Sequence, residues 1–194
     1  MEVFNVFHTP AILTEFTQHK SVQSKYLDVI NNVEKQNHSL ESDHPGTFVS
    51  HLNLHLNPIF NDLMTHLQHI TPKIKEMFDL KEGVRLGVDK MWATVTKPGG
   101  SIDREYISMS HFAGMYFLQS PKNGGTVRLF KSVFDRGWYD TLPITHANSA
   151  NTKDFTYVMP EGIIMLYPNV VDADTTANQS NKSRYIIHFG LSCI

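Results

Sequence analysis

The sequence predicts an α+β fold in which helices come first and short β-strands follow. Two amphipathic segments precede residue 80, and after Gly87 the chain changes to short apolar runs separated by turns. A hydrophobic fraction of 41% and an aromatic fraction of 11% can supply a core. We therefore expect a barrel or sandwich of strands covered on one side by helices. The 194 residues favour one domain, with a strand and cover helices in 1–87 and a β core in 88–194.

The N-terminal part predicts one strand and a first helix. The stretch 3–13 is apolar and rich in β-formers, with Pro10 as its interruption. A helical face then follows from apolar residues spaced three and four apart. These residues are Val22, Tyr26, Val29, Ile30 and Val33. The polar stretch 37–47 predicts a loop after this helix.

A second helix has clearer start and stop signals. Asn57 can cap its N-terminus, and Pro58 suits the first helical position, where the missing N–H would be unpaired anyway. The apolar face consists of Ile59, Phe60, Leu63, Met64, Leu67 and Ile70. We expect Pro72 to end or kink the helix, with a further turn or two after it.

The C-terminal part predicts short strands joined by turns. The apolar runs are 91–97, 110–119, 126–131, 162–168 and 183–194. The turn cluster "SPKNGG" at 120–125 predicts a hairpin between the second and third runs. The segment from about 132 to 155 shows no regular pattern and is expected to be a long loop.

Charge and cysteine content narrow the possible partners and compartment. A net charge of -2 and a pI near 6.6 give no indication of nucleic acid or acidic membranes. The single cysteine, Cys193, excludes an internal disulfide framework and suits a reducing compartment. The first 16 residues lack the features of a signal peptide, and no apolar run reaches the length of a membrane span. We expect synthesis in a cytoplasm.

Five segments carry a family resemblance in their order along the chain. They are "FHTPAIL", "MWATVTKPGG", "FAGMYFLQSPKNGG", "EGIIMLYPNVVDAD" and "NQSNKSRYIIHFGL". Together they resemble the iron(II)/2-oxoglutarate-dependent oxygenases, and most closely a small group common in tailed phages, especially cyanophages. The resemblance covers most of the chain. It implies a double-stranded β-helix, or jelly-roll, with the N-terminal helices packed on one side.

The resemblance also locates the positions of the iron ligands. Such enzymes hold iron with three protein ligands, usually two histidines and a carboxylate, and leave the opposite face open for 2-oxoglutarate and oxygen. Two ligands lie two residues apart on one strand, so that both point into the barrel. Here the first two positions hold Glu105 and Ile107. The third falls on Asp172 or Ala173, and the best alignment gives Ala173. Isoleucine and alanine have no donor atom, so we expect no metal site and no catalytic residues.

The positions expected to bind 2-oxoglutarate keep suitable residue types. The resemblance places Arg184 where the family's arginine pairs with the distal carboxylate of 2-oxoglutarate, and Tyr116 where a tyrosine lies near the same cosubstrate. A guanidinium suits this task because it offers two parallel hydrogen bonds. The alternative is a structural role for Arg184, in which it holds loop carbonyls or forms a salt bridge with Asp172 or Asp174.

A rebuilt metal site is a further alternative. His188 follows Arg184 by four residues, so both point to the same side of their strand. His188 is either a hydrogen-bonded core histidine or part of a new site with Glu105 and one of Asp172 or Asp174. Asp103 and Glu105 also have the spacing of the two metal ligands on one strand, shifted by two residues. The simpler interpretation is that Asp103 belongs to a solvated loop.

Three hypotheses for function follow. The first is a catalytically inactive oxygenase-like pseudoenzyme without cofactors, which acts as a structural or interaction protein. The phage resemblance implies a virion component, such as a neck, tail or capsid-associated subunit. Such a protein is made in the host cytoplasm and binds other phage structural proteins or itself, but neither nucleic acid nor membranes. The second is an active iron(II)/2-oxoglutarate-dependent hydroxylase with an atypical site. The third is a 2-oxoglutarate sensor that uses Arg184.

Aromatic residues in the long loop are the candidates for an interface. Phe134, Trp138 and Tyr139 lie within the segment 132–155. Exposed aromatic side chains of this kind are typical anchors of protein interfaces.

Overall fold

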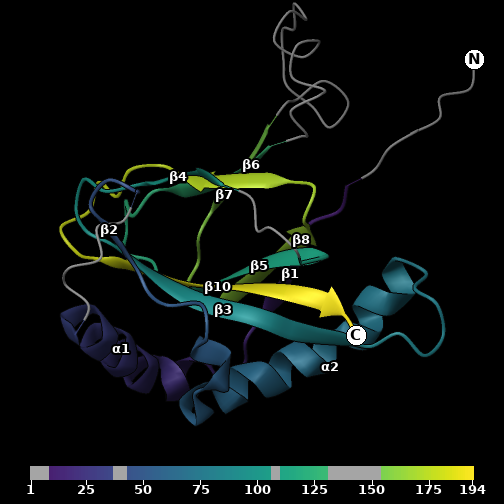
Figure 1. The fold of residues 1–194 in the computed structure, drawn as a ribbon. Coiled ribbons are helices and arrows are strands. Elements are labelled where there is room, and N and C mark those ends of the chain that lie inside the picture. Colours follow the sequence, from purple (N-terminus) through teal and green to yellow (C-terminus); the bar gives the residue numbers. More distant parts are fainter. Residues whose placement is uncertain (1–8, 37–42, 106–109, 131–153) are drawn as a thin grey trace, which may run out of the picture.

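A computed structural model describes residues 9–36, 43–105, 110–130 and 154–194 as two β-sheets and a helical layer (Figure 1). The large sheet has the strand order β1-β8-β5-β10-β3-β2, and the small sheet has the order β4-β9-β6-β7. All pairings between these strands are antiparallel. The sheets lie face to face, so the predicted double-stranded β-helix is confirmed.

The strands are short except at the centre of the large sheet. They are β1 (Ile12–Glu15), β2 (Thr47–Val49), β3 (Leu86–Thr96), β4 (Ile102–Glu105), β5 (Phe112–Gln119), β6 (Thr126–Phe130), β7 (Asp154–Val158), β8 (Ile163–Pro168), β9 (Asp172–Thr175) and β10 (Arg184–Cys193). The strands β1 and β2 come from the N-terminal part yet join the large sheet, so that part contributes more than cover helices.

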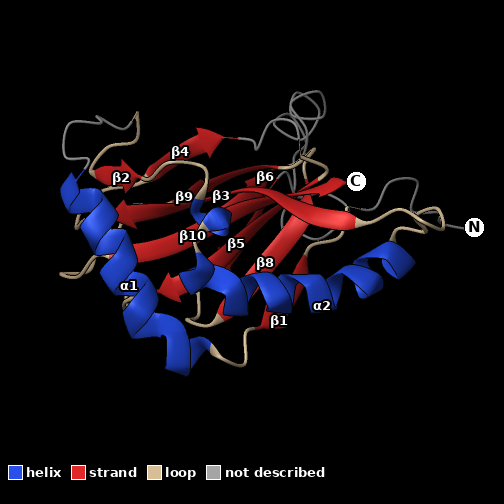
Figure 2. Cartoon of the chain, turned by 60° about the horizontal axis from the view of Figure 1, so that its bottom comes forward, coloured by secondary structure: helices blue, strands red, loops and turns tan. Residues whose placement is uncertain are grey.

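The helices cover the outer face of the large sheet (Figure 2). They are α1 (His19–Gln36), two 3-10 turns (Leu54–Leu56 and Pro58–Phe60) and α2 (Asn61–Met77). The predicted cap is confirmed, because the side chain of Asn57 accepts a hydrogen bond from the Ile59 N–H at 3.1 Å. No helix in the described ranges is long and apolar enough to cross a membrane.

Pro72 lies inside α2 instead of ending it. Proline has no N–H to donate to the carbonyl of Gln68, four residues earlier. The hydroxyl of Thr71 donates to that carbonyl instead, at 2.9 Å. This side-chain bond satisfies the acceptor that the proline leaves open, and the helix continues to Met77.

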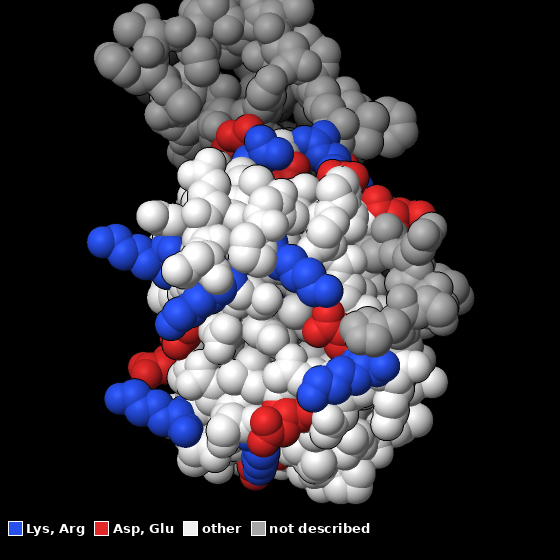
Figure 3. All heavy atoms as spheres, turned by 90° about the vertical axis from the view of Figure 1, so that its left-hand side faces the viewer, with Lys and Arg blue, Asp and Glu red and all other residues white. Residues whose placement is uncertain are grey.

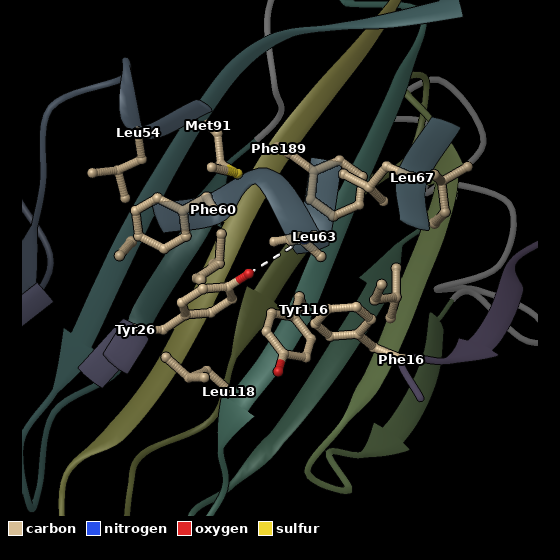
Figure 4. Packing of buried hydrophobic residues seen from close by; sticks show 14 of the residues in the cluster. Phe16, Tyr26, Leu54, Phe60, Leu63, Leu67, Met91, Tyr116, Leu118 and Phe189 are labelled. Carbon is tan, nitrogen blue, oxygen red and sulfur yellow. Dashed lines mark hydrogen bonds between the residues drawn. The ribbon is translucent and has the colours of Figure 1, made fainter. Parts of the chain in front are cut away.

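Two apolar cores lie on opposite faces of the large sheet. Between the helices and this sheet, Tyr26 of α1 packs with Phe60 and Leu63, and its hydroxyl accepts the Leu63 N–H at 3.3 Å (Figure 4). Between the two sheets lies a second core, which we call the barrel interior. Its buried apolar residues are Trp92, Ile102, Ala113, Met115, Phe117, Val127, Leu129, Met159, Met165, Tyr167, Val171, Ala173 and Ile186.

The strand β5 serves both cores. Phe112, Tyr116 and Leu118 face the helices, whereas Ala113, Met115 and Phe117 face the barrel interior. Successive side chains of a strand point to opposite faces, so this division follows from the period of two. The apolar sequence of β5 therefore reflects burial on both sides of the sheet.

The predicted hairpin at 120–125 is wrong. β5 pairs with β8 and β10 in the large sheet, while β6 pairs with β7 and β9 in the small sheet. The turn residues do redirect the chain, with Asn123 and Gly125 at positive φ, but they carry it from one sheet to the other. Turn chemistry predicts a change of direction and does not specify the pairing partner.

Candidate functional site

The expected positions of the first and third metal ligands lie opposite each other. β4 and β9 are neighbours in the small sheet, and Glu105 and Ala173 are paired at their Cα atoms. The two positions that the resemblance assigns therefore lie on neighbouring strands. Ile107 and the side chain of Glu105 lie outside the described residues.

The side chain at the third position has no means of binding a metal. Ala173 is buried in the barrel interior, where Ile102 and Leu129 belong to the same apolar cluster. Its neighbour Asp174 faces away from this cluster and binds Arg128 through two hydrogen bonds of 2.8 and 2.6 Å. Among the described residues, no group of three His, Cys, Asp or Glu side chains could hold a metal ion.

Arg184 is fully buried at the start of β10, and its two terminal nitrogens are engaged by the protein. Nη1 donates to the carbonyl of Gly124 at 2.6 Å and to that of Thr176 at 3.0 Å. Nη2 donates to the hydroxyl of Thr175 at 2.5 Å and to that of Thr96 at 3.3 Å. Only Nε has no partner among the described residues. The structural alternative in which Arg184 holds loop carbonyls is therefore observed, whereas Asp174 binds Arg128 instead.

A glycine turn makes room for this guanidinium. Gly125 has a φ of +93°, and a Cβ there would lie 2.7 Å from Nη1 of Arg184 and 2.6 Å from the Thr176 carbonyl oxygen. Both the backbone conformation and the space require glycine. Burial of the guanidinium lowers the pKa of Arg184 to about 10, so the group stays charged at neutral pH.

The loop before β10 is held by Asn178, a residue that sequence reasoning did not single out. Its fully buried side chain donates to the carbonyls of Thr96 at 3.0 Å and Lys182 at 2.8 Å. Its carbonyl oxygen accepts from the N–H and the hydroxyl of Ser180. The Asn-x-Ser pattern of "NQSNKSR" was the available signal, and its role here is to shape the loop that positions Arg184.

His188 is a buried core histidine. Its Nε2 lies 3.0 Å from the Thr94 hydroxyl, and its ring stacks on Trp92 with centroids 5.2 Å apart. Burial, together with the nearby charge of Arg184, lowers its pKa to about 3, so the ring is neutral at neutral pH. Asp174 is tied to Arg128, which weighs against a rebuilt site that includes it. The Glu105 side chain, which that site also needs, lies outside the described residues.

Tyr116 lies on the other face of the large sheet from Arg184, which corrects the expectation that the two residues share a pocket. Its hydroxyl is 2.6 Å from Nδ1 of His19, and its ring meets Phe16 edge-on at 5.4 Å (Figure 4). Burial raises the pKa of Tyr116. The candidate interface residues Phe134, Trp138 and Tyr139 lie outside the described residues.

Comparisons with known proteins bear directly on the family. Residues 90–190, more than half of the chain, match the family described as "Putative 2OG-Fe(II) oxygenase". The chain belongs to this 2OG-Fe(II) oxygenase family. No curated protein matches the sequence.

Solved structures of 2OG-Fe(II) oxygenases share the fold. A Pseudomonas putida prolyl-4-hydroxylase has a TM-score of 0.62 at 8% identity, with 95% of this chain and 93% of that chain covered. HygX from Streptomyces hygroscopicus, solved with nickel, 2-oxoglutarate and hygromycin B, has a TM-score of 0.60 at 11% identity, with 95% and 83% covered. The viral collagen prolyl hydroxylase of Paramecium Bursaria Chlorella virus-1, solved with 2-oxoglutarate, has a TM-score of 0.56 at 10% identity, with 96% of each chain covered.

The described residues do not fit the iron and 2-oxoglutarate that this family name implies. Ala173 presents a methyl group to an apolar cluster at a position where the resemblance expects a ligand. Arg184 already donates from both terminal nitrogens to protein oxygens. A carboxylate could form the usual two parallel hydrogen bonds only by displacing some of these acceptors.

Replacing Arg184 should destabilise the fold strongly. Arg184→Lys keeps the charge but loses the planar fork, so buried carbonyl and hydroxyl acceptors lose their donors. We expect the free energy of unfolding to fall by about 3 kcal/mol. Urea denaturation measures the change, with Arg128→Lys as the control, because that more exposed pair should be worth less than about 1 kcal/mol. Equal, small losses in both variants would contradict a structural role for Arg184.

His188 should make the stability of the protein depend on pH. Its pKa is about 3 in the folded state, against 6.5 for an unperturbed histidine, so below pH 6.5 the unfolded state binds a proton that the folded state does not. Stability is therefore lost as pH falls from 6.5 towards 3, by about 2 kcal/mol at pH 5. Denaturation at pH 7 and pH 5 should show a smaller loss for His188→Gln than for the wild type. Identical losses would mean that His188 is protonated in the folded protein.

Proposed function

We propose that this chain is a catalytically inactive member of the 2OG-Fe(II) oxygenase family that works as a structural or interaction module. The observation that carries the proposal is the buried methyl group of Ala173, which lies opposite Glu105 at a position where the resemblance expects a ligand. A single alanine at this position removes one of three metal ligands. The sequence supplies isoleucine at the position of another, Ile107.

The engagement of Arg184 supports the same proposal and weighs against a 2-oxoglutarate sensor. A receptor for a dicarboxylate needs donors that are ready to bind the ligand. Here the two terminal nitrogens of Arg184 bind Gly124, Thr176, Thr175 and Thr96. These contacts join the start of β10 to the 124–125 turn and to the ends of β3 and β9, so they serve the fold.

Surface features favour a protein as the partner. On the face shown in Figure 3, basic and acidic side chains alternate, and neither sign forms a continuous patch. Nucleic-acid-binding proteins present a clustered basic surface instead. Apolar side chains are exposed on β7, where Phe155 and Val158 are 50% and 71% exposed. From the resemblance to the phage group, we propose that the assembly is a virion, with this chain as a neck, tail or capsid-associated subunit.

Conversion of 2-oxoglutarate to succinate tests the loss of catalysis. The purified protein with iron(II), ascorbate and 2-oxoglutarate should form no more succinate than a heat-killed sample, because the ligand set is incomplete. An active prolyl hydroxylase run in parallel shows that the assay works. This uncoupled reaction needs no knowledge of a prime substrate. Succinate above the background would replace our proposal with the active hydroxylase hypothesis.

Iron binding provides an independent test. After anaerobic reconstitution and desalting, metal analysis should find far less than one iron per chain, because Ile107 and Ala173 offer no donor atoms. Calorimetric titration with 2-oxoglutarate should show no saturable heat. One tightly bound iron that disappears in Glu105→Ala would contradict the proposal. Saturable 2-oxoglutarate binding without iron would support the sensor instead.

A further inference from the structure

The two edge strands of the small sheet differ in how they are protected. β4 contains Asp103, Arg104 and Glu105 among its four residues. Charged residues on an edge strand discourage pairing with another chain. β7 has Asp154 at its first position, but its remaining residues, Phe155 to Val158, carry no charge. The β7 edge is therefore open to another strand in a way that the β4 edge is not.

Along residues 155–158, the outer edge of β7 faces solvent and no strand in the described part of the chain pairs with it. β7 pairs with β6 on one side, and no described strand pairs with its other side. Phe155, Thr156 and Val158 are exposed. Aromatic and β-branched residues favour strand pairing, and free backbone N–H and C=O groups on such an edge provide the hydrogen bonds.

A row of aromatic rings joins the barrel interior to β7 and then runs along that strand. Phe117 of β5 stacks with Tyr157 at a centroid distance of 6.4 Å, and Tyr157 stacks with Phe155 at 6.3 Å. Phe117 is fully buried, whereas Phe155 is half exposed. The row thus runs from a buried ring to a half-exposed one.

We propose that β7 pairs with β7 of a second copy of this chain, antiparallel about a two-fold axis that passes beside Thr156. In this register Phe155 faces the partner's Tyr157, and Tyr157 faces the partner's Phe155. The aromatic rows of the two copies then continue each other, and cross-strand aromatic pairs stabilise a sheet. The two small sheets become one continuous sheet, and the interface is self-complementary as a two-fold axis requires.

The charges at the end of the strand agree with the antiparallel arrangement. Asp154 faces the partner's Val158, so the two Asp154 side chains lie at opposite ends of the interface. A parallel pairing would bring them together, and like charges directly opposite each other destabilise a strand pair. The sequence of β7 therefore favours one orientation of the second copy.

This inference rests on the proposed function, since it names a partner for the interaction module. The two are nevertheless measured separately. A dimer that forms succinate would overturn the proposed inactivity and leave the pairing in place. A protein that stays monomeric and forms no succinate would overturn the pairing alone.

Opposite charges introduced at Val158 test the register. In the proposed dimer, Val158→Lys places a cation opposite the partner's Asp154, and Val158→Asp places an anion there. Sedimentation equilibrium of the full chain should give a dimer whose dissociation constant becomes about tenfold lower for Val158→Lys and about tenfold higher for Val158→Asp, because each dimer contains the changed pair twice. Leu13→Lys and Leu13→Asp are matched controls, since Leu13 is 44% exposed on the edge strand β1.

Three outcomes would overturn the proposal. They are a wild-type protein that stays monomeric up to its solubility limit, a change in the same direction for both Val158 variants, and Leu13 variants that shift the equilibrium as much as the Val158 variants do. Circular dichroism and thermal melting check that every variant is folded.

A cysteine at the axis gives a second test that does not depend on charge. Thr156→Cys in a Cys193→Ser background should form a disulfide-linked dimer under mild oxidation, because residues directly opposite in an antiparallel pair have Cβ atoms close enough for a disulfide. Leu13→Cys in the same background is the control. Cross-linking of Thr156→Cys that is no faster than the control would overturn the proposed axis.

Discussion

The buried guanidinium of Arg184 is the constraint on which the C-terminal half of the fold depends. A charge removed from water must be surrounded by hydrogen-bond acceptors, or it destabilises the structure by several kcal/mol. The acceptors here come from the 124–125 turn, the end of β3 and the end of β9. The guanidinium also constrains two other residue types. Residue 125 must be glycine, because a side chain there would collide with the guanidinium. Residue 178 is asparagine, whose side chain holds the loop that precedes Arg184.

If the metal ligands are lost as we propose, the same arginine explains how the oxygenase fold persists without them. In the oxygenases that the sequence resembles, the arginine at this position binds the distal carboxylate of 2-oxoglutarate. In this chain its hydrogen bonds hold the turn and two strand ends together, so its loss would weaken the barrel regardless of catalysis. Ala173, by contrast, contributes only a methyl group to an apolar cluster. A requirement for the fold alone therefore explains why Arg184 is present, and it places no demand for a metal ligand on residue 173.

Local periodicity predicted the parts of the structure that are fixed by local physics. The apolar spacing of α1 and the Asn57-Pro58 start of the second helical segment could be read directly, since a helix closes its hydrogen bonds within a few residues. β4 and β9 were missed because four residues are too few to show a period of two. The wrong hairpin at 120–125 and the intact helix at Pro72 share another cause. The pairing of β5 and β6 depends on neighbouring strands, and the continuation of α2 depends on the Thr71 hydroxyl. The local sequence pattern reveals neither partner.

Site residues could be predicted only where strand facing was known. Arg184 was correctly placed in the interior, whereas Tyr116 was assigned to the same space although it packs on His19 and Phe16. β5 is apolar on both faces, so its sequence contains no alternation from which the inward side could be identified. Only the pairing with β10 and the position of the helices settle the facing of Tyr116.

The burial of β5 and β10 on both faces has a consequence for how the molecule opens. Separating these strands would expose the helix-side core and the barrel interior together, so their amides can exchange with solvent only when nearly the whole domain unfolds. The small sheet borders only the barrel interior, so its separation would leave the core beneath the helices covered. That separation would still break the hydrogen bonds of Arg184 to Gly124, Thr175 and Thr176. The buried charge thus couples the opening of the small sheet to the stability of the large one.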